Sequence, residues 1–450
     1  MSDLLNIGSS AVSAYRSALA AVGENVANAE TPGYARRSIK LGQADGGGSS
    51  PDPIYRDSIL FGGVTAVGVQ RAWDSFRASE ARYAASSDGR ASVRRQWLTN
   101  IESALGDGPA GIGQSLTSFF NSGATLAATP ADRLARSAML TALDNVASAF
   151  RTTADALGRV AGGIADAARL DVEGVNGALA ALHKLNGTIR VAPAGSTAKA
   201  SLEDQRERLI DEIAARIDIT ATVSRDGAAS LSLAGASGVA LLAGTGPGYL
   251  SMATAADGRI AIHLSVAGTS MPLPATGGRL AGLAEMASAA ADRRAALDAL
   301  ASDLVTRINA ASADGVDGNG DPGADLLALP AGAASMRLIV SDPALIAAQG
   351  ADGVPNSNPL ALDALRGAGG FEDRWNAFVS DNAQSVAVAK SEAAAAASWR
   401  DLGFAALDEV TGIDLDREAA ELLRFQQAYG GATRIIQVAR ETVNAILDLF

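Results

Sequence analysis

Both ends of the chain carry apolar residues at alternating steps of three and four positions. Near the N-terminus the pattern runs through Leu5, Val12, Tyr15, Leu19, Val22 and Val26, with Gly8 in the one unfilled position. Toward the C-terminus it runs through Leu422, Phe425, Tyr429, Ala432, Ile436, Ala439, Val443, Ile446 and Phe450. This is the heptad pattern of helices that wind around one another. A helix with one apolar stripe must bury it, so we expect the terminal helices to pair with each other and with copies of the chain.

Turn-forming residues bound these two helices. Thr31-Pro32-Gly33 predicts that the first helix ends near Asn28, because the residue before a proline is pushed into extended geometry. Thr411-Gly412 interrupts the last helical region, so the terminal helix is expected to begin near Asp414. Val64, Val67 and Val69, together with several glycines, predict a short extended piece.

The interior of the chain changes its apolar period. Helical spacing persists to about Ile217, and alternation then begins at Ile219, with hairpin turns predicted at Asp226-Gly227 and Asp257-Gly258. Helical spacing resumes at Leu283. We therefore predict a mainly α, nested multidomain fold with an inserted small β domain and paired, coiled-coil-like terminal helices. The predicted domains are a terminal assembly domain (1–45 plus 405–450), a helical middle domain (46–218 plus 281–404) and the β domain (219–280).

Composition narrows the classes of partner. The 450 residues carry a net charge of −12, which argues against nucleic acid or an anionic membrane surface, because both require a cationic footprint. The chain has no cysteine, which excludes disulfides and thiolate chemistry. The first twenty residues lack a cationic start followed by a continuous apolar block, so no cleaved secretory signal is expected.

The sequence offers little catalytic or metal-binding chemistry. His183 flanks a helical stripe and His263 lies on an alternating strand, so the two histidines are expected to be surface residues without a catalytic role. Asp317-Gly-Asn-Gly-Asp321 resembles the start of a calcium loop, but Pro322 occupies the glycine position and Ala328 the position of the bidentate glutamate. Acidic residues are abundant, yet no spacing picks out a catalytic pair. We predict no catalytic residue, no metal and no cofactor, hence no enzyme.

The segment that follows the first predicted helical stripe is more informative about the class of protein than the features above. It reads Asn25-Val-Ala-Asn28-Ala-Glu-Thr31-Pro-Gly33-Tyr34, with Arg36-Arg37 two residues later. A Pro-Gly turn at a helix end accounts for Thr31 to Gly33 but not for the two asparagines. Asn25 and Asn28 share a helix face, from which polar groups can bond across a seam and determine its register. The segment resembles the N-terminal signature of bacterial flagellar axial proteins, which comprise rod, hook and hook-associated proteins.

The C-terminal segment narrows this resemblance. Gly412 to Tyr429 reads GIDLDREAAELLRFQQAY and is similar to the terminal helix of the hook-associated protein 1 family, NLDEE…LLRFQQAY. Hook and rod proteins differ around Arg424-Phe-Gln-Gln427. Two features depart from the family pattern. Gly430-Gly431 stands inside the predicted helix, which each glycine destabilises by about 1 kcal/mol relative to alanine, and the loop after Asp321 is short.

The resemblance implies a structural role at the junction between hook and filament. It implies assembly with copies of the chain, contact with hook protein and hook-associated protein 3, an export chaperone, and export to the flagellum outside the cell. A hook or distal rod protein is the alternative within the class, and a non-flagellar coiled-coil scaffold is the alternative outside it. The expected assembly interface comprises Leu5, Val12, Tyr15, Leu19, Val22, Asn25, Val26, Asn28, Thr31, Gly33, Tyr34, Leu422, Phe425, Gln426, Tyr429, Ile436, Val443, Ile446 and Phe450.

Overall fold

A computed structural model describes residues 2–44, 62–235, 239–243, 246–273 and 277–448. The chain divides into two compact units, each assembled from separate stretches of sequence. Unit 1 comprises Met1–Ala85, Val175–Tyr249 and Ser398–Phe450, and unit 2 comprises Ser86–Gly174 and Leu250–Ala397. Both termini therefore belong to unit 1, in agreement with the predicted nesting. The boundaries of the three predicted domains stay a prediction.

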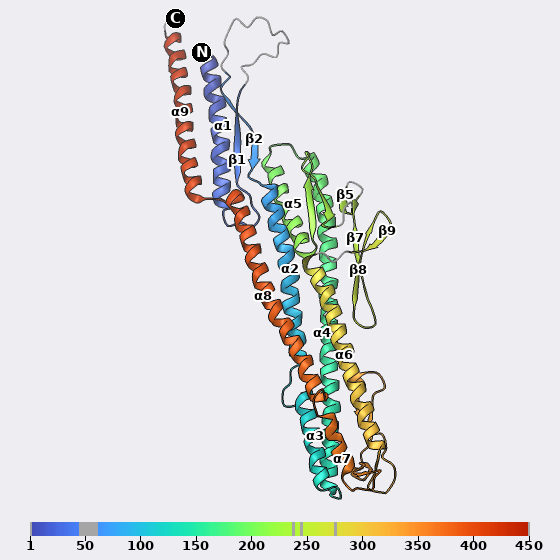
Figure 1. Cartoon of the computed structure of the whole chain (residues 1–450). Coiled ribbons are helices and arrows are strands. Elements are labelled where there is room, and N and C mark those ends of the chain that lie inside the picture. Colours follow the sequence, from blue (N-terminus) through green and yellow to red (C-terminus); the bar gives the residue numbers. More distant parts are fainter. Residues whose placement is uncertain (1, 45–61, 236–238, 244–245, 274–276, 449–450) are drawn as a thin grey trace. The chain divides into compact units, whose positions relative to one another are not determined.

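Unit 1 contains the paired terminal helices. Helix α1 spans Ser2–Ala27 and α9 spans Leu415–Leu447, and the two pack against each other as predicted (Figure 1). The first helix ends one residue before the predicted end, and Asp414 caps α9 by accepting hydrogen bonds from the backbone N–H groups of Asp416 and Arg417. Helix α9 continues through Gly430-Gly431 without a break in its assignment.

A β-hairpin packs on α1. Strand β1 (Arg37–Gln43) pairs antiparallel with β2 (Val64–Arg71), with a register shift between Lys40 and Leu41. The sequence predicted the extended piece of β2 but not its partner β1. The backbone of Gly68 approaches Gly195 so closely that a Cβ there would lie 2.9 Å from the Gly195 Cα atom, and Val69 N–H donates to Gly195 O at 2.7 Å. This contact joins the hairpin to the turn before α5 (Thr197–Arg216).

Both predicted hairpins of the β insert are present. In unit 1, β3 (Ile219–Val223), β4 (Ala229–Leu233), β5 (Ala240–Ala243) and β6 (Gly246–Pro247) form one sheet in sequence order. A second sheet contains β7 (Tyr249–Thr254), β8 (Ile260–Val266) and β9 (Thr269–Pro272). The turns carry Gly227 and Gly258 at positive φ, a backbone conformation that glycine adopts without strain. The insert thus holds two sheets, and the boundary between the units falls between Tyr249 and Leu250.

Unit 2 is a bundle of long helices with an apolar core. Its helices are α3 (Ile112–Ala128), α6 (Gly278–Ala313), α7 (Ser357–Leu362) and most of α2 (Ser75–Ala104), α4 (Arg133–Val191) and α8 (Phe371–Thr411), of which α2, α4 and α8 also contribute to unit 1. Short strands β10 (Gly315–Val316) to β13 (Gln349–Gly350) include the pair β11 (Leu327–Ala328) and β12 (Arg337–Leu338). Its core contains Ile101, Phe119, Phe150, Leu157 and Trp375. Among the described helices of the chain, none has the length and hydropathy needed to cross a bilayer.

Candidate functional site

The signature segment forms the turn between α1 and β1. After α1, Asn28 N–H donates to Glu24 O at 3.0 Å, and the Thr31 hydroxyl donates to Asn28 Oδ1 at 3.2 Å. Gly33 has φ +74°, and a Cβ there would lie 2.8 Å from the Cγ of Arg208. A glycine is therefore required both by the left-handed backbone and by the close approach of α5.

Asn25 joins the end of α1 to three other parts of unit 1. Its side chain is fully buried, and its Nδ2 donates to Arg37 O at 2.8 Å and to Glu418 Oε2 at 3.0 Å. Its Oδ1 accepts from Arg37 N–H at 3.0 Å and from the Tyr34 hydroxyl at 3.1 Å. These four bonds use both donors and both lone pairs of the amide. One asparagine thus connects the end of α1, the signature turn, the start of β1 and the start of α9.

Asn28 behaves differently from Asn25. Its Nδ2 donates to Glu24 O at 2.9 Å within its own helix end, and its Oδ1 accepts from Thr31. Of the two asparagines predicted to bond across the helix pair, Asn25 reaches α9 and Asn28 stabilises the local turn.

Glu418 anchors the first turn of α9. Its side chain has 0% exposure, and Oε1 accepts from Arg36 Nε at 2.6 Å while Oε2 accepts from Asn25. The backbone N–H of Arg36 also donates to Thr411 O at 2.8 Å, at the end of α8. A buried carboxylate is costly unless it is paired and hydrogen-bonded, so these contacts determine where α9 begins relative to α1. We call Asn25, Tyr34, Arg36, Arg37 and Glu418 the terminal-helix junction.

Carboxylates on α5 form ion pairs next to this junction, and one of them binds a junction residue directly. Asp204 accepts from Arg37 Nη2 at 2.9 Å and from Arg71 Nε at 2.5 Å, and all three side chains are almost fully buried. The Arg71 guanidinium also stacks over Trp73 at 4.2 Å from the ring centroid. Because Arg37 begins β1 and Arg71 ends β2, one carboxylate secures both strands of the hairpin.

The next two carboxylates on α5 bind an arginine of α2. Arg82 donates to Glu207 at 2.5 Å and to Asp211 at 2.6 Å, and Arg206 also pairs with Glu207. Burial by itself would raise the pKa of Glu207, but Arg206 and Arg82 lower that pKa overall. Burial raises the pKa of the Asp211 carboxyl above its ordinary value even though Arg82 acts to lower it. Each carboxylate thus has an arginine partner, an arrangement that favours a structural ion network over acid–base chemistry.

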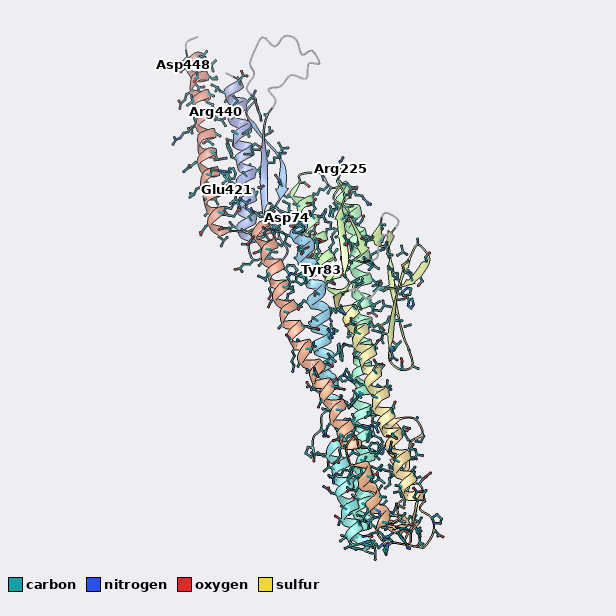
Figure 2. The ribbon with its side chains drawn as sticks, in the orientation of Figure 1. Asp74, Tyr83, Arg225, Glu421, Arg440 and Asp448 are labelled. Carbon is teal, nitrogen blue, oxygen red and sulfur yellow. The ribbon has the colours of Figure 1, made fainter. Side chains whose placement is uncertain are left out.

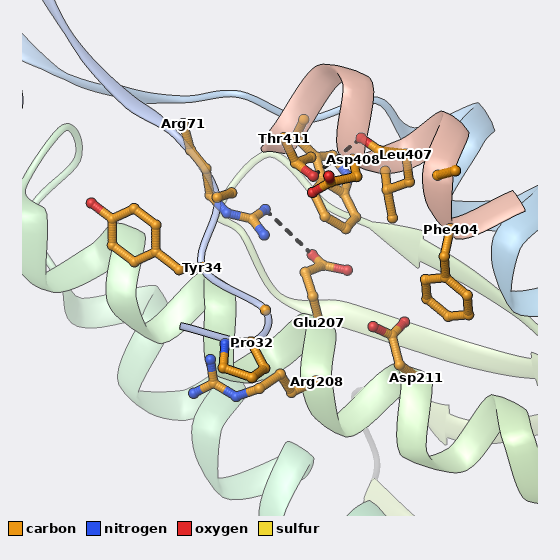
Figure 3. Close-up of a pocket in the computed structure, with 14 residues that line it drawn as sticks. Pro32, Tyr34, Arg71, Glu207, Arg208, Asp211, Phe404, Leu407, Asp408 and Thr411 are labelled. Atoms are coloured by element: carbon orange, nitrogen blue, oxygen red, sulfur yellow. Dashed lines mark hydrogen bonds and ion pairs between the residues drawn. The ribbon is translucent and has the colours of Figure 1, made fainter. Parts of the chain in front are cut away.

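A pocket of about 530 Å³ opens beside this network (Figure 3). It is lined by the signature turn, by α5 and by the last turns of α8, from which Phe404 and Leu407 project. Arg71 and Glu207 face each other inside it at 3.9 Å. Burial raises the pKa of Tyr34 to about 12, so this phenol remains neutral at physiological pH. Among the described residues, no three histidine or carboxylate side chains are grouped closely enough to hold a metal ion.

The helix pair brings many predicted interface residues together inside one chain. Gly8 of α1 lies against α9 so closely that a Cβ there would be 2.6 Å from Ile436 Cγ1, and Tyr15 and Phe425 stack with ring centroids 6.4 Å apart. Other predicted residues are buried or half-buried: Leu5, Val12, Leu19, Val22, Asn28, Tyr34, Leu422, Tyr429 and Val443. The exposed ones are Val26, Thr31, Gly33, Gln426 and Ile446. Phe450 lies outside the described residues. A role for these residues between subunits stays a prediction.

The buried stripe of α1 is built from smaller residues than the sequence suggested. Gly8, Ala11, Ala18, Val22 and Asn25 are buried, whereas the larger Val12 and Leu19 are only half-buried. Small residues allow the backbones of paired helices to approach closely, and their own three–four spacing is the signal that could have identified them. No periodicity indicated that Glu418 pairs with Arg36, or that the α5 carboxylates pair with arginines of β1, β2 and α2, because these partners lie far away in the sequence. Arg206, which is adjacent to Glu207, is the exception.

Comparisons with known proteins place the chain in the class that the signature indicated. Residues 5–34 match the family model described as flagella basal body rod protein, which covers α1 and the signature turn. Residues 98–327, about half of the chain, match the model described as flagellar hook-associated protein FlgK helical domain. The chain belongs to the flagellar hook-associated protein 1 (FlgK) family, whose members are structural proteins of the flagellum.

Individual relatives agree with this membership. The flagellar hook-associated protein 1 of Salmonella typhimurium is 27% identical over 338 residues, covering 73% of this chain and 60% of that protein. The protein of the same name from Bacillus subtilis is 25% identical over 491 residues, covering 97% of this chain and 96% of its own length. The solved flagellar hook junction protein FlgK of Burkholderia pseudomallei is 25% identical, with a TM-score of 0.50 over 56% of this chain and 47% of that one. The chain thus spans about 60% of the Salmonella relative.

Proposed function

We propose that this chain is a structural subunit of the bacterial flagellum that assembles with copies of itself at the junction between hook and filament. The observation that carries the proposal is the terminal helix pair, in which α1 and α9 are joined through Asn25, Glu418 and Arg36. The name of the Burkholderia relative, a hook junction protein, supports the position along the flagellum.

The same proposal names the neighbours. Hook protein would lie on one side and hook-associated protein 3 on the other, with an export chaperone before assembly and a location outside the cell. The match of residues 98–327 to the hook-associated helical domain favours this assignment over a hook or distal rod protein. A coiled-coil scaffold without a flagellar role would need neither that match nor the signature turn.

The test is electron microscopy of cells that lack the gene, combined with an assay of flagellin in the culture medium. We expect hooks without filaments, and flagellin lost to the medium. Missing hooks would instead indicate a hook or rod protein, and normal filaments would contradict the proposal.

Complementation supplies the matched control. The full chain should restore filaments, whereas a chain ending at residue 413, which lacks α9 but keeps unit 2 intact, should not. If the shortened chain restored filaments, the terminal helix pair would not be the assembly element.

A further inference from the structure

Helix α9 has apolar side chains on two sides, and α1 covers only one of them. Residues such as Phe425 and Ile436 face α1. On the opposite side, Leu423 is 58% exposed, Ile435 38% and Val438 56%, and side chains stand out along α9 from Glu421 to Asp448 (Figure 2). We call Leu423, Gln427, Gly431, Ile435, Val438 and Thr442 the outer stripe, because steps of four and three residues keep them on one face. Three of these six positions, Leu423, Ile435 and Val438, carry exposed apolar side chains that α1 does not cover, and burying them requires a second partner.

Unit 1 also contains an open apolar groove. It has a volume of about 600 Å³ and lies between α1, the β1–β2 hairpin and the turn before α5. Small or aliphatic side chains dominate its lining, which comprises Ser17, Ala20, Ala21, Glu24, Ile39, Ala66, Val67, Gly68, Val69, Gly195, Ser196 and Thr197. We call it the α1–β2 groove. Small residues along such a groove allow the backbone of another helix to approach closely. Helix α9 suits such an approach, because Gly431 at its surface has no side chain.

The outer stripe and the groove cannot meet within one chain. The α1 residues that line the groove, Ser17, Ala20 and Glu24, lie on the side of α1 opposite Gly8 and Tyr15, which contact α9. Helix α1 therefore stands between the groove and α9, and a helix is about 10 Å across with its side chains. Within the part of the chain that the structure describes, each subunit thus presents two apolar surfaces that face in different directions.

We propose that the outer stripe of α9 in one subunit packs into the α1–β2 groove of the next copy. The inference rests on the proposed function and names the two surfaces through which subunits join. The contact is heterologous, because a different surface of each copy takes part, and repetition of such a contact produces a ring or a helical array. Electrostatics agree with the pairing. Glu24 is the charged residue among the described groove lining, and although its carboxylate pairs with Arg37 of the same chain at 3.3 Å, its side chain stays 46% exposed and can accept a second cation. Arg434 lies beside the outer stripe and supplies that charge from the neighbouring copy.

Cysteine cross-linking tests the contact directly, since the natural chain has no cysteine. The purified double variant Ala20→Cys/Val438→Cys would be treated at increasing protein concentration with a short bis-maleimide cross-linker, which tolerates a shift of one helical turn. We expect a ladder of dimers, trimers and larger species. A mixture of the two single variants should yield dimers only, because each copy then carries one half of the contact.

The matched control is Ala20→Cys/Val223→Cys, in which the second cysteine replaces a similarly exposed valine on β3. It should yield no ladder. Dimers from either single variant alone would indicate a symmetric contact and overturn the proposal. The absence of a ladder at concentrations where the chain associates would also overturn it.

Flagella isolated from the complemented deletion strain separate this inference from the proposed function. A ladder in purified protein, combined with absence of the chain from flagella, would refute the flagellar function but retain the contact. Incorporation of the double variant into flagella without cross-linked species would refute the contact and leave the function intact.

Discussion

The Arg36–Glu418 pair offers the sharpest test of how the terminal helices are held. Arg36 Nε and Glu418 Oε1 lie 2.6 Å apart, and the side chains are 16% and 0% exposed, respectively. Replacing Arg36 by alanine leaves a fully buried carboxylate whose remaining side-chain partner, among the described residues, is Asn25. Loss of one member of a buried ion pair typically costs about 3–5 kcal/mol, and we expect Arg36→Ala to fall in that range.

A double-mutant cycle separates the interaction energy of the Arg36–Glu418 pair from the other contributions of the two side chains. Arg36→Ala and Glu418→Ala should each be strongly destabilising, and the double variant should lose less than the sum, because removing both charges leaves neither one unpaired. The control is Glu421→Ala on the same helix, where the carboxylate pairs with the exposed Arg424 and contributes about 0–1 kcal/mol.

Hydrogen exchange measured by mass spectrometry is the assay, because it reports local opening of α9 separately from unfolding of the other unit. Amides in the first turns of α9 should exchange much faster in Arg36→Ala and Glu418→Ala than in Glu421→Ala. Equal exchange in Glu418→Ala and Glu421→Ala would refute the reasoning. Strict additivity in the double variant would also refute it.

Three further predictions concern other parts of the chain. The pKa of Glu207 is lowered in the folded state, so the ionised carboxylate stabilises the fold fully above its ordinary pKa of 4.5, and this stabilisation is lost as the pH falls through the folded pKa. Glu207→Gln should therefore flatten the acid side of a curve of stability against pH measured by circular dichroism. An unchanged slope would contradict this. Gly68→Ala should lower the melting temperature, because the new Cβ would lie 2.9 Å from the Gly195 backbone. Gly430→Ala has open space around it and should stabilise α9 by about 1 kcal/mol. A higher melting temperature for Gly68→Ala than for Gly430→Ala would show that the hairpin contact adapts to the added methyl group. Asn382 is 1% exposed, and neither polar atom of its amide has a hydrogen-bond partner among the described residues. Asn382→Leu, which removes this buried amide, should therefore raise the denaturation midpoint, and a lower midpoint would contradict this reasoning.

Local patterns in the sequence determined the main elements. The three–four spacing at each end predicted α1 and α9, because a helix repeats every 3.6 residues and an apolar stripe must be buried. The glycines at 227 and 258 predicted the two hairpins of the insert, since tight turns need positive φ. The asparagine signature and the LLRFQQAY-like stretch indicated the family, which the match of residues 98–327 then established.

Tertiary structure decided which of these residues act together. Asn25 and Glu418 are 393 positions apart, and no local periodicity relates an amide at the end of one helix to a carboxylate at the start of another. The same holds for the α5 carboxylates, whose partners come from β1, β2 and α2 in addition to Arg206 of α5 itself. The fold also decided that a glycine stands at position 8 of α1, because α9 approaches so closely there that a Cβ atom would lie 2.6 Å from Ile436 Cγ1.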